Sequence, residues 1–149
     1  MNRTKKILLG IVGGLLAIQL VPVDRTNPPV DATLNFTDVE EVPKRAEEIL
    51  RNACYDCHSN ETVYPNYAYV APISWSIKEH VNQGRKYANF SKWNKYSQYA
   101  KQNIIKSSIR EIQSGEMPMK GYEPYHPKAK LSKEDKAYII DYLKTLIKN

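Results

Sequence analysis

Residues 51–67 of the chain read RNACYDCHSNETVYPNY and hold both of its cysteines. Cys54 and Cys57 are three residues apart, and His58 follows directly. At the end of a helix, residues i and i+3 project to one side, so the two sulfurs can face one edge of a common ligand. Cys-x-x-Cys-His is the attachment signature of a c-type haem. We therefore expect both thiols to form thioether bonds to one haem, with His58 as the proximal ligand of its iron.

Three other uses of the cysteine pair are possible. A structural disulfide would close a loop so short that it removes little chain entropy. A thioredoxin-like redox pair belongs in a βαβ setting, whereas the chain has mainly helical patterns. Half of a zinc site would need a second Cys pair or a His-x₃₋₅-His motif, and the sequence has neither. The sequence therefore favours haem attachment over these alternatives.

Length and composition indicate one globular domain. A chain of 149 residues can bury its own core, and 42% of its residues are apolar. The formal net charge is +6, but Arg3, Lys5 and Lys6 precede an apolar run, and the remainder has no basic block. We therefore expect no nucleic-acid partner.

Residues 1–23 are typical of an export segment. A short cationic start is followed by an uncharged apolar run from Ile7 to Ile18, which continues to Val23. This pattern predicts a signal peptide or a signal anchor, and a buried core helix is a third interpretation. No clean small-x-small cleavage site follows, so we favour an anchor formed by residues 7–23. Export would leave the basic end in the cytoplasm and place the rest on the extracytoplasmic, for example periplasmic, side of the membrane.

The rest of the chain divides into a linker and a helical domain. Residues 24–41 contain a Pro pair and no helical period, which predicts an extended tether. Residues 42–149 form the expected haem-binding domain, with little strand-like alternation. Long loops are expected at 58–71, 86–98 and 115–131.

Four helices are predicted within this domain from apolar residues that recur at helical spacing. The second is expected to open at Pro72, the third to end at Gly115, and the last to begin at Ser132 as its N-cap. The expected apolar faces are Val42, Ala46, Ile49, Leu50 and Ala53; Ile73, Ile77, His80, Val81 and Gly84; Ile105, Ile109 and Ile112; and Ile139, Tyr142, Leu143 and Leu146.

Met117 is the preferred candidate for the other side of the iron. It lies in QSGEMPMKGYEPYHP, a Gly- and Pro-rich loop that can lay a thioether across a haem face, and Pro118 restricts its backbone to extended conformations. Met119 and His126 are alternatives, as is an open or water-ligated iron. His80 is a further candidate, although a histidine on an apolar helix face is more often a packed core residue.

Two longer stretches carry a resemblance to a known family. CYDCHSNETVYPNYAYVAPISWSIKEHVNQGRKYANFSKW and the later IQSGEMPMKGYEPYHPKAKLS resemble the haem-binding domain family of small monohaem c-type cytochromes, over most of residues 45–147. The resemblance implies an all-α, cytochrome-c-like fold around one covalently bound haem. It also implies that Cys54 and Cys57 are the haem-linked thiols, His58 the proximal ligand and Met117 the distal ligand.

Other residues could surround the haem. Arg85 could neutralise one haem propionate through a charge-assisted hydrogen bond, and the Trp93 indole could donate to the other. A solvated arginine and a core tryptophan are the alternatives. Trp75, Tyr64 and Tyr67 are expected to be walls of the pocket.

These features predict an electron carrier and not an enzyme. With one haem c per chain, His/Met ligation raises the reduction potential relative to bis-His ligation and leaves no site for a small molecule. Redox partner proteins of unspecified identity are expected, and Lys92, Lys95 and Lys101 could steer an acidic one. The alternatives are a haem-based sensor or minor peroxidase with a displaceable distal ligand, and a haem-free thiol-active module tethered to a membrane.

Overall fold

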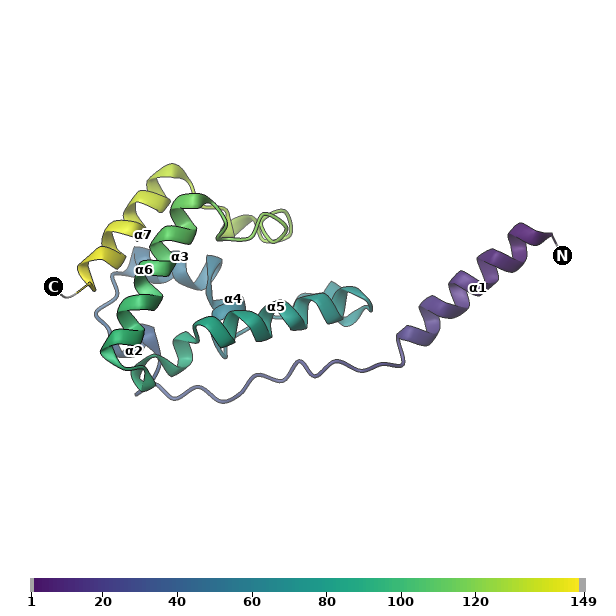
Figure 1. Ribbon diagram of the computed structural model, residues 1–149, viewed down its shortest axis with the longest axis horizontal. Helices are drawn as coiled ribbons and strands as arrows, with labels where there is room; N and C mark the ends of the chain where they lie inside the picture. Colours follow the sequence, from purple (N-terminus) through teal and green to yellow (C-terminus); the bar gives the residue numbers. More distant parts are fainter. Residues whose placement is uncertain (1, 148–149) are drawn as a thin grey trace.

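The computed structural model describes residues 2–147, and this part of the chain contains helices and turns but no β-strand (Figure 1). The predicted all-α class is therefore confirmed. The elements are α1 (Arg3–Ile18), α2 (Phe36–Val39), α3 (Lys44–Ala53), α4 (Tyr55–His58), the 3₁₀ helix η1 (Asn66–Tyr69), α5 (Ile73–Tyr87), η2 (Phe90–Lys95), α6 (Gln98–Ser114), η3 (Pro127–Ala129) and α7 (Lys133–Thr145).

Helix α1 lies apart from the other helices (Figure 1). None of its sixteen residues is buried, which excludes the interpretation as a buried core helix. Its apolar side chains are instead exposed, for example Leu8 (56%) and Leu16 (65%). Among residues 2–147, no helix has both the length and the apolar character needed to cross a membrane.

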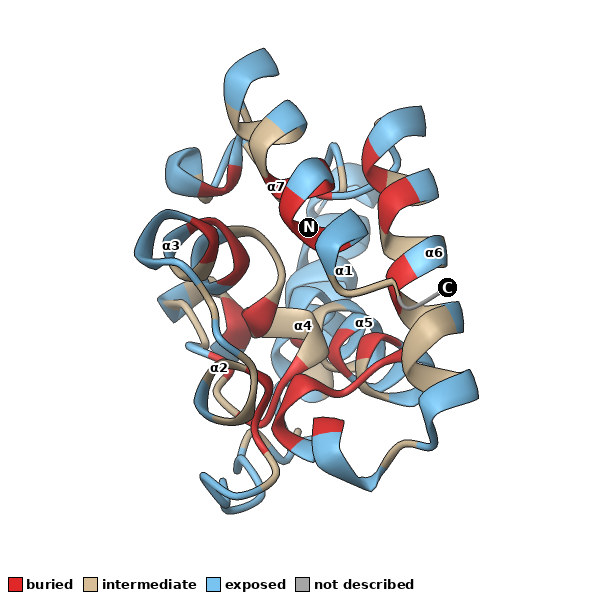
Figure 2. Cartoon of the chain, turned by 90° about the vertical axis from the view of Figure 1, so that its left-hand side faces the viewer, coloured by how far each residue is buried: buried red, intermediate tan, exposed pale blue. Residues whose placement is uncertain are grey.

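The core of the domain lies between α3, α6 and α7, whose buried residues face one another (Figure 2). The apolar faces predicted for these three helices are confirmed for most of their residues. Val42, which precedes α3, and Ala53 and Leu146 are only partly buried. The buried set is Ala46, Ile49 and Leu50 of α3; Ile105, Ile109 and Ile112 of α6; and Ile139, Tyr142 and Leu143 of α7.

The predicted helix boundaries are also confirmed. Gly115 ends α6 in the left-handed region with φ of 74°, a conformation that glycine adopts without steric cost. The Ser132 hydroxyl accepts a 3.0 Å hydrogen bond from the Asp135 backbone N–H at the start of α7. Pro72 directly precedes α5.

The apolar face predicted for α5 is only partly correct. Val81 and Gly84 are buried, but Ile73 is 49% exposed and His80 is exposed as well. The reason is that α5 packs mainly against α4 and η1, and its first turns project beyond the other helices of the domain (Figure 1). His80 is therefore a surface residue and not a packed core histidine.

Three aromatic residues outside the predicted helices complete the core. Phe36 of α2 is 1% exposed and lies edge-on to Trp93, with ring centroids 4.9 Å apart. Phe90 lies 5.5 Å from Phe36. The segment 86–98, expected to be a loop, thus contains the end of α5 and the 3₁₀ helix η2, which buries two of these rings. Single aromatic residues in short elements produce no helical period, which is why the sequence pattern did not reveal them.

The segment 24–41, expected to be a free tether, binds to the domain. The Asn27 side chain donates to the Thr62 carbonyl at 2.8 Å, and the Pro29 carbonyl accepts from the Asn60 side chain at 3.1 Å. Arg85 donates to Asn27 Oδ1 at 2.7 Å. Only the first part of the segment is extended as predicted: residues 32–34 form a turn and residues 36–39 form α2, which places Phe36 in the core.

Candidate functional site

The Cys-x-x-Cys-His motif forms a single helical turn directly after α3. Cys54 ends α3 and precedes α4, and the His58 N–H donates to the Cys54 carbonyl at 2.9 Å. This turn brings Cys54, Cys57 and His58 together, as the motif predicts. Both thiols are free.

The His58 ring is oriented by the backbone of the segment after α5. Its Nδ1 lies 3.2 Å from the Ala88 carbonyl oxygen. Because a carbonyl only accepts, Nδ1 must carry the proton in this bond, and a neutral ring then presents the lone pair of Nε2. Burial lowers the pKa of His58, although hydrogen bonds with the Ala88 and Gly84 backbone oppose this. The neutral, Nδ1-protonated ring is the form that binds a metal through Nε2.

Gly84 lets α5 approach the motif. A Cβ atom at Gly84 would collide with the Cys57 carbonyl oxygen and lie 3.1 Å from the Cys57 Cβ. Glycine inside a helix costs about 1 kcal/mol relative to alanine, so its presence here is explained by close packing and not by helix propensity. This glycine is the one sequence signal that could have identified the α4–α5 contact in advance.

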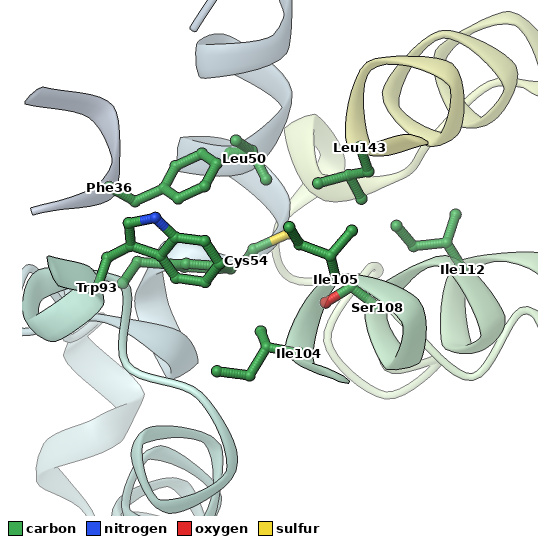
Figure 3. Close-up of a pocket in the computed structure, with 10 residues that line it drawn as sticks. Phe36, Leu50, Cys54, Trp93, Ile104, Ile105, Ser108, Ile112 and Leu143 are labelled. Carbon is green, nitrogen blue, oxygen red and sulfur yellow. The ribbon is translucent and has the colours of Figure 1, made fainter. Parts of the chain in front are cut away.

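A small apolar pocket of about 30 Å³ lies beside Cys54 (Figure 3). The Cys54 sulfur points into it, toward Ile105 of α6. This is about the volume of one water molecule, so the pocket marks the apolar surroundings of Cys54 and is far smaller than a haem. The lining residues are Phe36, Leu50, Cys54, Phe90, Trp93, Ile104, Ile105, Ser108, Ile112 and Leu143, and they include neither His58 nor Met117.

The protein environment keeps both thiols uncharged near neutral pH. Burial, together with the neighbouring Cys57, raises the pKa of Cys54 to about 12. Burial and the charge of Asp56 raise the pKa of Cys57 to about 11, against an opposing effect of Arg85. Because the thiolate is the nucleophile in disulfide exchange, these pKa values disfavour thiol redox chemistry in the folded chain.

A buried hydroxyl without a partner lies near the motif. Among the residues that the structure describes, Tyr64 Oη has no hydrogen-bond partner. Burial raises the pKa of Tyr64, with opposing effects of the Arg85 and Cys57 charges. A buried donor left unpaired is costly and suits a ligand with an acceptor group, such as a carboxylate. The chemistry of the residues around the cysteines therefore fits a haem: free thiols, an oriented imidazole, apolar neighbours and a spare donor.

The two residues expected to bind haem carboxylates have protein partners instead. Arg85 donates to the Ser59 carbonyl at 2.7 Å, in addition to its bonds with Asn27 and Thr62. Trp93 is 1% exposed and its Nε1 donates to Glu40 Oε1 at 2.7 Å. Trp93 is thus a core tryptophan in the pocket wall, and Arg85 fixes the segment 24–41.

Met117 lies at the end of the pocket wall that α6 forms. It is 37% exposed, follows the lining residue Ile112 by five positions, and its N–H donates to the Glu111 carbonyl at 3.1 Å. Met119, the nearest alternative, is partly buried on the same loop. The distal ligand stays a prediction.

The loop that carries Met117 is attached to the motif. The Tyr122 hydroxyl donates to Asp56 Oδ2 at 2.5 Å, and Asp56 lies between the two cysteines. Tyr67 Oη lies 2.8 Å from His126 Nε2. The His126 ring stacks on Tyr122 with centroids 3.9 Å apart and an angle of 10°. His126 Nε2 thus already has a partner, and Tyr67 is a loop contact as well as a possible wall.

Of the remaining predicted residues, Trp75 is 37% exposed on α5. Lys92 and Lys95 are exposed as a partner surface would require, but Lys101 is not free. Its Nζ lies 3.9 Å from Glu40 Oε1 and 5.3 Å from the Trp93 ring. The lysine surface is therefore smaller than the sequence suggests.

Fold and site together define an all-helical protein built around a Cys-x-x-Cys-His turn beside an apolar pocket. The sequence model of the family described as "Haem-binding domain" matches residues 13–145 of the chain. The chain therefore belongs to the haem-binding domain family. No curated protein and no solved structure matches it.

Proposed function

We propose that this protein is a monohaem c-type cytochrome that transfers one electron at a time between partner proteins outside the cytoplasm. The observation that carries the proposal is the motif turn, where two free thiols and an Nδ1-protonated imidazole lie together beside an apolar pocket. Membership of the haem-binding domain family supports the cofactor. The haem, when bound, supplies reversible one-electron exchange.

Covalent attachment would use both thiols. The S–H group of Cys54 would add across one vinyl group of the haem and that of Cys57 across the other. Each addition would form one S–C bond and give the thiol hydrogen to the second vinyl carbon, so that no atom would be lost. The high pKa values keep both sulfurs protonated in the folded chain, and no disulfide competes. Attachment would be one haem per chain.

His58 and Met117 are the residues that would hold the haem iron. His58 would bind through Nε2, while Ala88 fixes the ring through Nδ1. Met117 is preferred to His126 because His126 Nε2 is already paired with Tyr67. Tyr64, with its unpartnered hydroxyl, replaces Trp93 as the candidate donor to a haem carboxylate. Protein burial of the site and His/Met ligation would together raise the reduction potential.

We also propose that residues 7–23 anchor the protein and keep the haem domain on the extracytoplasmic side. The argument rests on the exposed apolar side chains of α1 and on Arg3, Lys5 and Lys6 at its start. Oxidation and reduction would each involve another redox protein, with Lys92 and Lys95 as the exposed cations available to an acidic one.

A haem-based sensor or minor peroxidase is the second candidate, and the exposure of Met117 favours it. A ligand that is 37% exposed on a loop is easier to displace than a buried one. In the folded, haem-loaded protein the two functions differ in the reaction with carbon monoxide.

Electrochemistry and carbon monoxide binding test the proposal together. The haem-loaded wild-type protein should give one reversible one-electron wave and no fast carbon monoxide adduct after reduction. Rapid adduct formation in the wild type would instead support the sensor or peroxidase. A colourless product from a host able to mature c-type cytochromes would contradict both candidates. Met119→Ala is the matched control for a Met117→Ala variant, because it changes the same loop without removing the proposed ligand.

A further inference from the structure

The end of α5 that projects from the domain is uncharged and apolar. We define the α5 tip as residues 64–77, which include η1 and the first turn of α5. These fourteen positions contain no charged residue, whereas a chain with 26% charged residues would place about four there. The exposed apolar side chains of the α5 tip are Tyr69 (58%), Val70 (51%), Ile73 (49%) and Trp75 (37%).

The α5 tip is bound to the end of α1. The side-chain amide of Gln19, at the C-terminus of α1, donates to the Ala71 carbonyl at 3.0 Å and accepts from the Ala71 N–H at 2.9 Å. The Arg25 guanidinium lies 4.1 Å from the centroid of the Tyr69 ring. Figure 1 shows the far end of α5 beside the end of α1. The exposed residues of the α5 tip are therefore next to the C-terminal end of α1, within the segment 7–23 that we propose as the anchor.

The segment between α1 and α2 has little freedom to swing the α5 tip away. A free linker of this length would be a flexible coil, but Asn27 is bonded to Thr62 and Pro29 to Asn60, close to the motif turn. The chain that follows α1 is thus attached to the domain at further points, in addition to the bonds of Gln19.

The apolar part of α1 is shorter than the bilayer core, which indicates that lipid covers the neighbouring α5 tip. The uncharged part of α1, from Ile7 to Ile18, spans about 18 Å, whereas the hydrocarbon core of a bilayer is about 30 Å thick. The deficit falls at the outer end of α1, where Leu20 (84%) and Val21 (55%) are also exposed. Tyrosine and tryptophan are favoured at the membrane–water interface, because their rings are apolar and their polar ends are hydrated.

We propose that the α5 tip inserts into the outer interface of the lipid bilayer that holds α1, and so fixes the orientation of the haem domain on the membrane. The inference rests on the membrane anchoring proposed above. From Ile73 to Gly84, which contacts the motif turn, α5 extends about 17 Å. The proposed haem site is held within this distance of the membrane surface, where membrane-bound redox proteins can reach it.

Photo-crosslinking to lipid tests this contact. The full-length chain carries p-benzoylphenylalanine at position 73 and is reconstituted into phosphatidylcholine vesicles. The matched control has the same group at position 99, since Tyr99 is 78% exposed on α6, outside the α5 tip. We expect lipid adducts by mass spectrometry at position 73, at least fivefold more than at position 99. Equal yields, or adducts at 73 with protein only, would overturn the proposal.

Two further readouts separate this contact from the proposed function. Resistance to carbonate extraction reports anchoring by α1, and visible absorbance reports the haem. A chain that stays in the membrane and binds haem, but forms no lipid adduct at position 73, contradicts the α5 tip contact alone. A chain that is extracted by carbonate contradicts the anchor and the contact together. In Gln19→Ala, the chain should remain in the membrane and the adduct yield at position 73 should fall at least twofold.

Discussion

The two sides of the proposed haem site differ in how firmly the protein fixes them. The motif turn, residues 54–58, lies between α3 and α5, with His58 bonded to Ala88 and Gly84 against Cys57. The distal loop, residues 115–126, is attached through the Tyr122–Asp56 and Tyr67–His126 contacts, and Met117 remains 37% exposed.

This difference follows from the kind of interaction on each side. Backbone hydrogen bonds and close helix packing fix the motif turn, whereas tyrosine side chains fix the distal loop. The protein thus holds the proposed attachment point and the proposed proximal ligand firmly, and would position the proposed distal ligand when the haem is bound. Each prediction below removes a feature of one side and leaves the other intact.

The largest expected effect comes from removing the thiols. The double variant Cys54→Ala/Cys57→Ala should lose all covalent haem, because no other thiol is available. Each single variant should keep one thioether bond. Haem staining of the denatured proteins on a gel measures this. Covalent haem in the double variant would mean that attachment does not involve the motif turn.

Thiol reactivity in the haem-free chain should differ strongly between the folded and denatured states. At pH 8 alkylation of Cys54 and Cys57 should be slower on the order of 100-fold in the folded chain, because their pKa values of about 12 and about 11 leave little thiolate. Rates with and without guanidinium provide the measurement. Equal rates in the two conditions would contradict the buried position of the motif turn.

The same pKa shifts predict a pH dependence of stability. The folded state favours the protonated thiols, so their contribution to stability is complete below the ordinary pKa of 9.0 and is lost as pH rises through about 11 to 12. Denaturant unfolding as a function of pH measures this loss.

Gly84→Ala should destabilise the protein by about 1–3 kcal/mol, since the added Cβ collides with the Cys57 backbone, although alanine favours the helix by about 1 kcal/mol. Denaturant unfolding measures the change. The control Gly121→Ala has no atom within 4 Å of its new Cβ and should change stability by less than about 0.5 kcal/mol. A neutral Gly84 variant would show that α5 does not pack on the motif turn as described.

Met117→Ala tests the distal loop. Loss of the thioether ligand should lower the reduction potential on the order of 0.1 V or more, within the roughly 0.8 V range that axial ligands set. The potential comes from a spectroscopic redox titration. Met119→Ala should leave it nearly unchanged, and the opposite pattern would transfer the ligand role to Met119.

The smallest effect is expected for Tyr122→Phe. This variant removes the hydrogen bond between the distal loop and Asp56, which should cost about 1–2 kcal/mol and increase hydrogen exchange in residues 115–126. Tyr99→Phe, on an exposed tyrosine, is the control. If exchange in the loop were unchanged, the Tyr122–Asp56 bond would not hold the loop.

The sequence predicted those features that repeat or follow a motif. Helical periods revealed α3, α6 and α7 with their buried faces, and the cysteine spacing revealed the motif turn. Long-range contacts leave no such pattern. The roles of Phe36 in the core and of Ala88 as the partner of His58 depend on segments that meet only in the folded chain.

The haem-carboxylate roles suggested for Arg85 and Trp93 stay predictions, and both side chains have protein partners. Arg85 donates to Asn27, and the Trp93 indole donates to Glu40. Residue type alone does not reveal such competition. By contrast, the glycine inside α5 and the uncharged α5 tip were visible in the sequence, and their meaning became clear once α4 and α1 were placed beside them.

Tandem mass spectrometry of the tryptic peptide 52–78, from protein matured in a host that attaches c-type haem, is the most direct test of the central claim. This peptide contains both cysteines of the chain. We predict that its mass equals that of the unmodified peptide plus one intact haem, with both sulfurs blocked to alkylation. An unmodified peptide with two alkylated cysteines would contradict covalent haem attachment at Cys54 and Cys57.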